Sequence, residues 1–305
     1  MSFTSVVKNE VSKIDTIKTE SIAELSAIIQ NSEISKKQIK ISTENASVAR
    51  KIFSSVKNLF NEYAKITVRK GYNYSKNLIY ILEINKNVEN ILNSLAILEN
   101  DEILDIPNEY IIDDMDSMRA YLRGLFLING SVNDPKKSRY HLEFLVSNEE
   151  YAKFIVKSLN EFYLNSKYIK RDNKYMIYIK EAEKIGDFLR IINAPNAVLY
   201  YEDIRIYRDH KNMTNRLNNM EQANVDKMIE SSLKQVKEIE KIKEIGGLDL
   251  LDEKVKEAAI YRLKYPEVSL TELSEIISIE TGNEITKSGL YHRFRKISNL
   301  ASKIK

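Results

Sequence analysis

Carboxylates are the side chains in this 305-residue sequence whose type could support metal-dependent chemistry. Glu33 and Asp134 lie shortly after apolar runs, and the stretch DDMD at 113–116 lies just before one. Negative oxygen ligands of this kind hold Mg²⁺ when an enzyme cleaves a phosphodiester bond. Two of these groups have a structural alternative. Asp134 precedes Pro135, as in many turns, and acids in front of a helix cap its free N–H groups and suit its dipole.

Other catalytic chemistry has little support in the composition. The absence of Cys excludes disulfides, thiolate zinc sites and cysteine nucleophiles, and it fits a reducing compartment. With only His141, His210 and His292, we expect neither a histidine-rich metal site nor a cofactor. No apolar run approaches the roughly 18 residues of a membrane span, and residues 1–15 lack the apolar stretch of a signal peptide. We therefore expect a cytoplasmic protein without a membrane partner.

Length and charge limit the organisation of the chain. Its length suggests about two domains, and 43% hydrophobic residues are enough to bury both cores. The net charge of +3 is too small to identify a partner, so the distribution of charge along the chain matters more.

An internal repeat is the strongest organisational signal in the sequence. The stretch LSAIIQNSE at 25–33 aligns with LRGLFLING at 122–130 at an offset of 97 residues. This alignment sets Ala27 opposite Gly124 and Ser32 opposite Asn129. The helical stretches that begin at residues 43 and 146 align at an offset of 103, so the second copy carries about six extra residues within 130–139.

Both copies contain the same predicted elements. A β pair follows the second helix, at 64–84 around a polar turn and at 167–181, and both pairs are rich in β-branched and aromatic residues. Helical patterns at 88–98 and 182–192 end the two copies. The order helix, strand, helix, strand, strand, helix predicts a duplicated α+β unit over about 15–200.

Gly124 lies inside an apolar helical pattern and needs an explanation. A glycine within a helix costs about 1 kcal/mol relative to Ala. Residues 121–128 leave almost no polar face, so protein should enclose this helix. Because the repeat places Ala27 at the equivalent position, we predict that the two helices cross at Gly124 and Ala27. The alternative is an ordinary core helix with an incidental glycine.

The two helices, each heading an αββαββα-like unit, resemble the LAGLIDADG homing-endonuclease fold, and LRGLFLING matches that motif at Leu122, Gly124, Leu125 and Gly130. The resemblance implies that the motif helices form the interface between half-domains and that the acid in the penultimate motif position binds the catalytic metal. Asn129 and Ser32 stand at those positions, and neither supplies a negative oxygen ligand. The resemblance therefore implies a retained fold without catalytic residues or a metal site. Glu33 is the only acid next to the expected site.

The segment after the repeats is predicted to contain a basic connector and a long helix. Residues 205–219 form a polar stretch without strand alternation, and its basic residues could add DNA contacts: Arg205, Arg208, Lys211 and Arg216. Apolar residues then recur at helical spacing from Val225 to Ile245 and stop at two glycines. We interpret this pattern as an amphipathic linker helix with a solvated Lys/Glu face.

From Leu248 the pattern is typical of a small all-α DNA-binding unit. A first helix ends before Pro266, and the residues SLTE at 269–272 form a capping box that opens a second helix through Ile277. Gly282 and Asn283 mark a turn, and Thr286 can cap a third helix. We therefore predict a helix-turn-helix.

The third helix has one apolar and one basic face. Leu290, Phe294 and Ile297 repeat at helical spacing, while residues 286–305 contain six Lys or Arg and no acid. Such a helix is what a helix-turn-helix presents to the major groove, and the basic excess favours phosphate contact. The predicted DNA-contacting residues are Thr286, Lys287, Ser288, Tyr291, His292, Arg293, Arg295 and Lys296. The alternative is a three-helix interaction module with a solvated basic tail.

Several stretches in this order resemble the bacterial WhiA family across essentially the whole chain, at residues 119–144, 200–224 and 269–301. The resemblance implies a transcriptional regulator linked to sporulation in some bacteria and to cell division and chromosome segregation in others. The predicted domains are a LAGLIDADG-like domain at 1–204 with repeats at about 15–105 and 115–204, a connector and linker helix at 205–247, and a helix-turn-helix domain at 248–305. The turn SIETGNE is longer than usual, which leaves the target sequence open.

Two function classes are compatible with these patterns. The favoured one is a non-catalytic, nucleoid-associated regulator whose C-terminal domain reads double-stranded DNA. Its N-terminal domain then adds a second DNA surface or a docking surface for a protein such as another transcription factor or RNA polymerase. The rival is a metal-dependent LAGLIDADG endonuclease. The patterns specify neither an oligomeric state nor activation as against repression.

Overall fold

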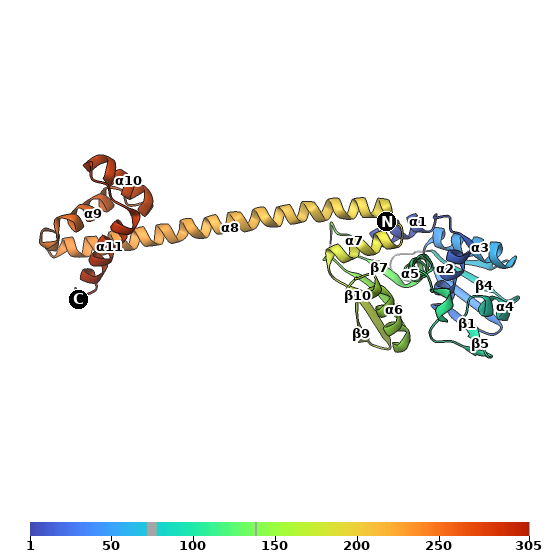
Figure 1. The fold of residues 1–305 in the computed structure, drawn as a ribbon. Helices are drawn as coiled ribbons and strands as arrows, with labels where there is room; N and C mark the ends of the chain where they lie inside the picture. The colour runs from blue at the N-terminus through green and yellow to red at the C-terminus, as the bar shows by residue number, and fades with distance from the viewer. Residues whose placement is uncertain (72–77, 138, 305) are drawn as a thin grey trace. The chain divides into compact units, whose positions relative to one another are not determined.

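The computed structural model describes residues 1–71, 78–137 and 139–304, and its chain forms two compact units, Met1–Arg208 and Asp209–Lys305. The first unit combines helices with two four-stranded antiparallel sheets and a two-stranded hairpin, and the second is helical (Figure 1). These units agree with the predicted α+β class, in which an all-α domain follows a duplicated one. Among the described residues, no helix is long and apolar enough to cross a bilayer.

The first copy of the repeat forms a sheet in the strand order β1-β2-β4-β3. Its elements are α2 (Lys18–Gln30), β1 (Glu33–Ser35), β2 (Gln38–Thr43), α3 (Ala46–Phe60), β3 (Lys65–Lys70), β4 (Leu78–Ile84) and α4 (Val88–Ser94). Ile39 and Ile41 of β2 lie opposite Ile84 and Leu82 of β4, and all four side chains are buried on one face of the sheet. The polar turn predicted between β3 and β4 lies at 72–77, outside the described residues.

The second copy repeats this topology in the strand order β7-β8-β10-β9. Its elements are α5 (Met115–Asn129), β7 (Gly130–Val132), β8 (Leu142–Val146), α6 (Glu149–Glu161), β9 (Lys167–Arg171), β10 (Lys174–Ile179) and α7 (Ala182–Ile191). Asn45 and Asn148, aligned by the repeat, both cap the following helix by accepting hydrogen bonds from two backbone N–H groups. The duplication is therefore confirmed. Residue 138, within the predicted insertion, lies outside the described part of the chain.

The predicted order of elements was wrong at one point. Two strands, not one, separate the first two helices of each copy. The additional strands, β1 and β7, contain three residues each and follow the motif helices almost directly. A three-residue strand is too short for alternation of apolar and polar residues to identify it.

Four short elements outside the two copies also belong to the first unit. Helix α1 (Phe3–Val11) precedes the first copy, and its buried residues Phe3, Val7 and Val11 join the domain core. Between the copies lie the hairpin strands β5 (Leu98–Glu99) and β6 (Glu102–Ile103) and the 3-10 helix η1 (Glu109–Ile111).

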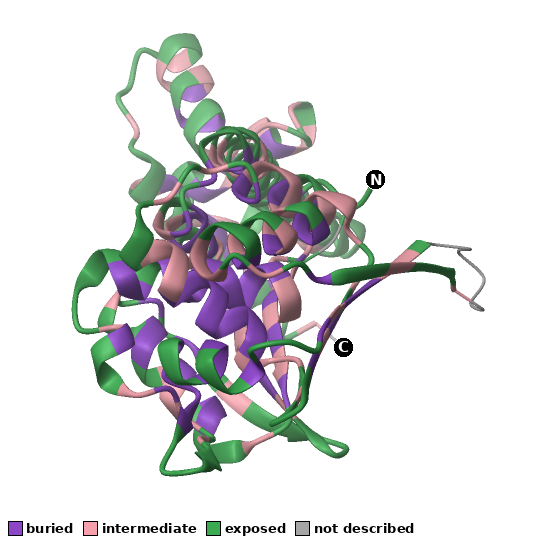
Figure 2. Ribbon diagram, turned by 90° about the vertical axis from the view of Figure 1, so that its right-hand side faces the viewer, coloured by how far each residue is buried: buried purple, intermediate pink, exposed green. Residues whose placement is uncertain are grey.

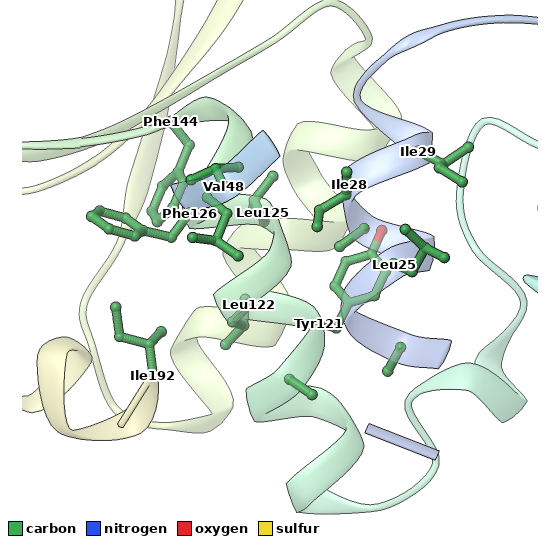
Figure 3. Packing of buried hydrophobic residues seen from close by; sticks show 14 of the residues in the cluster. Leu25, Ile28, Ile29, Val48, Tyr121, Leu122, Leu125, Phe126, Phe144 and Ile192 are labelled. Carbon is green, nitrogen blue, oxygen red and sulfur yellow. The ribbon is translucent and has the colours of Figure 1, made fainter. Parts of the chain in front are cut away.

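Helices α2 and α5 form the centre of the first unit, and buried residues gather along them and on the inner faces of the sheets (Figure 2). Figure 3 shows Tyr121 of α5 beside Leu25 and Ile28 of α2, and Phe126 beside Phe144 of β8. The Phe126 and Phe144 ring centroids are 6.5 Å apart in an edge-to-face contact. This continuous apolar interior joins the two copies into one domain.

A 50-residue helix, α8 (Pro195–Glu244), continues from the first unit into the second. It includes the predicted connector at 205–219, so the linker helix begins well before Val225. Pro195 suits the first turn of a helix, and no Gly or Pro interrupts the sequence until Gly246, which has a left-handed φ of 71°. The polar composition of residues 205–219 therefore does not indicate a break in the helix.

The second unit continues with η2 (Gly247–Leu250), α9 (Glu253–Lys264), α10 (Leu270–Thr281) and α11 (Lys287–Ala301). Ile239 and Ile242, near the end of α8, are buried in the same core as Leu273 of α10 and Phe294 of α11. The three-helix unit therefore packs on the last turns of α8.

Candidate nucleic-acid interface

Helix α11 separates an apolar face from a polar and basic one, as its sequence predicts. The Thr286 side chain caps the helix by accepting a hydrogen bond from the Gly289 N–H at 3.2 Å. Leu290, Phe294 and Ile297 are buried in the core of the unit. Seven of the eight predicted DNA-contacting residues are exposed: Thr286, Lys287, Ser288, Tyr291, His292, Arg295 and Lys296. This face contains four groups that can carry positive charge and no acid, so it suits a phosphate backbone.

Arg293 lies apart from the other predicted contacts. Its side chain is half-buried, and its Nη1 donates to the Glu257 carboxylate at 2.7 Å and to the Lys254 carbonyl at 3.0 Å. Arg293 is directly before Phe294 on the helix, at the edge of the buried stripe. Its charge is therefore paired with α9, and it stabilises the unit instead of extending the basic face.

The turn before α11 is fixed by side chains that bond to backbone. Ser269 and Glu272 form the predicted capping box at the start of α10, and Gly282 ends that helix with a left-handed φ of 69°. Ser278 accepts a hydrogen bond from the Ile285 N–H at 2.9 Å. The predicted long turn SIETGNE was wrong, because α10 continues to Thr281, four residues beyond Ile277, and only residues 282–286 separate it from α11. The contact of Ser278 with this short turn was not predicted from the sequence.

Arg262 supports the same unit from inside and was also missed. It is 1% exposed, and its Nη1 donates to the carbonyls of Val268 at 2.7 Å and Tyr265 at 3.2 Å. Its guanidinium lies 5.5 Å from the centroid of the Phe294 ring. Arginine is mostly a surface residue, so the sequence alone predicts an exposed side chain here. Only the fold shows that backbone carbonyls surround it.

The four basic residues proposed as additional DNA contacts have different environments. Arg205 donates to Glu202 at 2.6 Å, and Arg208 donates to the Pro135 carbonyl at 2.6 Å and lies over the Tyr140 ring. Both arginines are half-buried in the first unit, whereas Lys211 and Arg216 are exposed on the part of α8 that belongs to the second. The predicted connector therefore does not form one basic surface.

The predicted helix crossing exists at Gly124. A Cβ built on this glycine would collide with the backbone oxygen of Glu24 and lie 3.1 Å from the Cβ of Ala27. Only the absence of a side chain lets α5 approach the backbone of α2 this closely. The packing reason for Gly124 is confirmed.

An ionic cluster that the sequence did not reveal lies beside this crossing. The Arg123 Nε donates to the Glu24 carboxylate at 2.6 Å, and the Lys51 Nζ lies 3.5 Å from the same carboxylate. Arg123 and Glu24 are 4% and 2% exposed, so both charges are removed from water and depend on each other. The two half-domains are joined by charge as well as by apolar packing.

The C-terminal ends of the motif helices meet through neutral groups. The Asn129 Nδ2 donates to the Asn31 Oδ1 at 2.8 Å, and the Asn31 Nδ2 donates to the Tyr151 hydroxyl at 2.8 Å. The Ser32 hydroxyl, just past the end of α2, donates to the Ile28 carbonyl of that helix at 2.8 Å. Across the crossing, Asn129 therefore contacts Asn31 of the first copy, one residue before its aligned counterpart Ser32.

The phenol groups at this seam are also uncharged. The hydroxyls of Tyr151 and Tyr121 lie 2.8 Å apart, and burial raises the pKa of Tyr151 to about 12 and that of Tyr121 well above its ordinary value. Amides and neutral phenols hydrogen-bond well, but they provide none of the negative oxygen ligands that a catalytic Mg²⁺ requires.

The acids considered as substitutes have other partners. Glu33 pairs with Lys40 at 2.7 Å on the surface, and Asp134 accepts hydrogen bonds from the Lys136 N–H and the Tyr200 hydroxyl. Asp114 caps α5, and its hydrogen bonds with Ser117 lower the pKa of its carboxyl. The capping alternative for this acidic stretch is thus confirmed. In the described parts of the chain, no three His, Cys, Asp or Glu side chains are grouped so that they could hold a metal.

A lysine lies at the carbonyl end of α5. The Lys8 Nζ of α1 donates to the Ile128 carbonyl at 3.3 Å and lies 5.7 Å from the centroid of the Phe126 ring. Burial lowers the pKa of this ammonium to about 8, against an opposing effect of Glu44. A cation at this helix end suits the negative pole of the helix dipole. No spacing in the sequence relates Lys8 to a residue 120 positions later.

Three family models together match most of the chain. The WhiA N-terminal LAGLIDADG-like domain matches residues 18–98, the WhiA LAGLIDADG-like domain 118–211 and the WhiA C-terminal HTH domain 214–301. Proteins described as probable cell division protein WhiA, from Staphylococcus haemolyticus and Staphylococcus aureus, are 43% and 42% identical to it. Both matches extend over 310 residues and cover 100% of this chain and 98% of the relative. The chain belongs to the WhiA family.

Solved WhiA structures agree with this fold. Full-length WhiA from Thermotoga maritima is 26% identical with a TM-score of 0.59, and the match covers 100% of this chain and 99% of that one. An N-terminal LAGLIDADG domain of WhiA is 25% identical with a TM-score of 0.50, over 63% of this chain and 90% of that domain.

Membership of the WhiA family places the two candidate sites in known domains. Helix α2 falls within the first LAGLIDADG-like region, and all but the first three residues of α5 fall within the second. Helices α9 to α11 fall within the WhiA HTH domain. An HTH domain is a DNA-binding type of fold that inserts its recognition helix into the major groove.

Proposed function

We propose that this WhiA-family chain is a DNA-binding transcriptional regulator without nuclease activity. The observation that carries the proposal is the exposed, acid-free face of α11, which is held by a capped turn and a buried apolar stripe. A recognition helix contacts base edges with its N-terminal residues, so Lys287, Ser288 and Tyr291 would read sequence. Arg295 and Lys296 would contact phosphates.

The absence of nuclease activity in this proposal rests on the neutral seam between the motif helices. In-line displacement at a phosphodiester requires metal ligands that converge from both half-domains. Asn31, Asn129 and Tyr151 form a hydrogen-bonded chain in that place. The LAGLIDADG-like domain would then act as a scaffold and as a docking surface for a protein such as another transcription factor or RNA polymerase.

The proposed biological setting is the nucleoid. The family resemblance supports a link to cell division and chromosome segregation or, in some bacteria, to sporulation, and the staphylococcal relatives are described as probable cell division proteins.

A genome-wide crosslinking map of bound DNA tests this function. We expect discrete peaks upstream of genes for the intact chain and their loss in a variant with both Lys287→Ala and Arg295→Ala. Expression of the adjacent genes should change in the same variant. Peaks that persist in the variant, or bound sites without any change in transcription, would contradict a regulator that reads DNA with α11.

A further inference from the structure

The segment that joins the two half-domains carries a one-sided charge. Residues 87–118 contain nine Asp or Glu and no Lys, Arg or His, although the whole chain has a net charge of +3. Large apolar side chains are exposed in the same segment: Ile103 is 40%, Tyr110 58% and Met115 50% exposed. Exposed apolar groups within a charged surface are typical of a protein-binding site.

This segment forms one wall of an apolar groove in the first unit. The groove has a volume of about 640 Å³ and lies between residues 106–113 and helix α6. Ile106, Ile112 and Phe154 are half-buried in its lining, and Met118 is buried. Tyr110 also lines the groove and leaves more than half of its side chain in contact with solvent. An apolar anchor from another molecule could therefore be enclosed there.

The rim of the groove is acidic. Glu109 and Asp113 lie on the connecting segment, and Glu150 and Glu161 lie on α6. Of the two lysines in the lining, Lys153 is already paired with Glu150 at 2.6 Å and with Glu149 at 3.7 Å. With four acids against Lys153 and Lys157, the lining keeps an excess of negative charge.

We infer that this groove docks a partner protein through a segment that presents an apolar or aromatic anchor flanked by Lys or Arg. The inference rests on the proposed function, since it gives the docking surface of the regulator a location and a partner chemistry. An acidic rim repels the phosphate backbone, so DNA is not the occupant. The same rim attracts a basic segment and disfavours acidic ones, while the apolar lining supplies the buried centre of the contact.

A photo-crosslinking experiment in the bacterium that makes the protein tests this inference. The full chain carries p-benzoylphenylalanine at position 110 or, as a matched control, at position 63, where the native tyrosine is 63% exposed. Mass spectrometry identifies the crosslinked peptide. We expect position 110, but not position 63, to capture a peptide whose apolar residues are flanked by Lys or Arg. Adding Glu109→Lys and Asp113→Lys should reduce this crosslink at least tenfold.

Other outcomes overturn the inference. Crosslinks from position 110 to DNA, to a second copy of this chain or to an acidic segment would contradict it, as would a yield no higher than at position 63. DNA binding measured on the same charge-reversed variant separates this result from the proposed function. Retained DNA binding without a specific crosslink rejects only the groove, whereas failure of the parent chain to bind DNA rejects the regulator itself.

Discussion

Gly124 and its neighbour Arg123 decide how the two half-domains meet. The glycine removes the side chain that would separate the backbones of α5 and α2, and the arginine supplies a buried charge that Glu24 requires. Replacing Arg123 leaves the buried Glu24 carboxylate with only Lys51, 3.5 Å away, to compensate its charge, which is destabilising. The interface therefore depends on single side chains at its closest point.

Gly124→Ala should destabilise the first unit by about 1 to 3 kcal/mol, and Gly124→Leu by more, because even a Cβ collides with the Glu24 backbone. Thermal or urea unfolding of the full chain measures the change. Gly282→Ala is a useful comparison, since nothing lies within 4 Å of its Cβ position and only its left-handed φ opposes the substitution. A Gly124→Leu variant that unfolds like the parent would show that the helices do not touch there.

Lys8 predicts a pH dependence of stability. Burial lowers its pKa from 10.5 to about 8 in the folded state, so between these values the unfolded chain binds more protons and stability rises with pH. The cost of burying the charged Lys8 ammonium lowers the free energy of unfolding by about 3 kcal/mol. This cost is fully present below pH 8.

The Lys8→Met variant isolates this contribution from all other titrating groups. The free energy of unfolding of the variant minus that of the parent should be largest near pH 7 and fall by pH 10.5. Denaturant unfolding at a series of pH values measures it. A difference that stays constant over this range would mean that the Lys8 ammonium is not desolvated.

Element boundaries were predictable where a local rule determines them. Asn45, Asn148, Ser269 and Thr286 cap helices because their side chains accept from nearby backbone N–H groups, and the sequence places such residues before apolar periodic stretches. The contact of Asn129 with Asn31, not with Ser32, depends on the angle at which two helices cross. The spacing of residues along the chain does not determine that crossing angle.

Helix α11 offers matched variants for the DNA contact. Arg295→Ala should weaken binding to all DNA sequences alike and reduce the salt slope by about 1, because we assign Arg295 to a phosphate contact. Arg293→Ala should instead lower the stability of the second unit, since it breaks the ion pair with Glu257, and leave the affinity of the folded protein nearly unchanged.

Fluorescence anisotropy with labelled DNA and thermal unfolding distinguish the two effects. Equal losses of affinity for Arg293→Ala and Arg295→Ala, with both proteins folded, would contradict the assignment of one residue to packing and the other to DNA.

In the molecule as a whole, the basic surface and the acidic surface lie in different units of the chain. The acid-free face of α11 belongs to the second unit, and the acidic segment at 87–118 belongs to the first. The overall class of each unit was predictable, because duplication and helical periodicity are properties of long stretches. The groove between α6 and residues 106–113 was not predictable from the sequence, because only the fold brings these two segments together.

We expect this LAGLIDADG-like chain to bind DNA without a catalytic metal. The most direct test incubates the purified full chain with a genomic fragment that it binds, in Mg²⁺, in Mn²⁺ and in a chelator, and measures both affinity and fragment length. We predict equal affinity in all three conditions, intact DNA, and a steep fall in affinity with added salt as phosphate contacts release counterions. Metal-dependent cleavage by the unmodified protein, abolished by Glu33→Gln, would contradict the account.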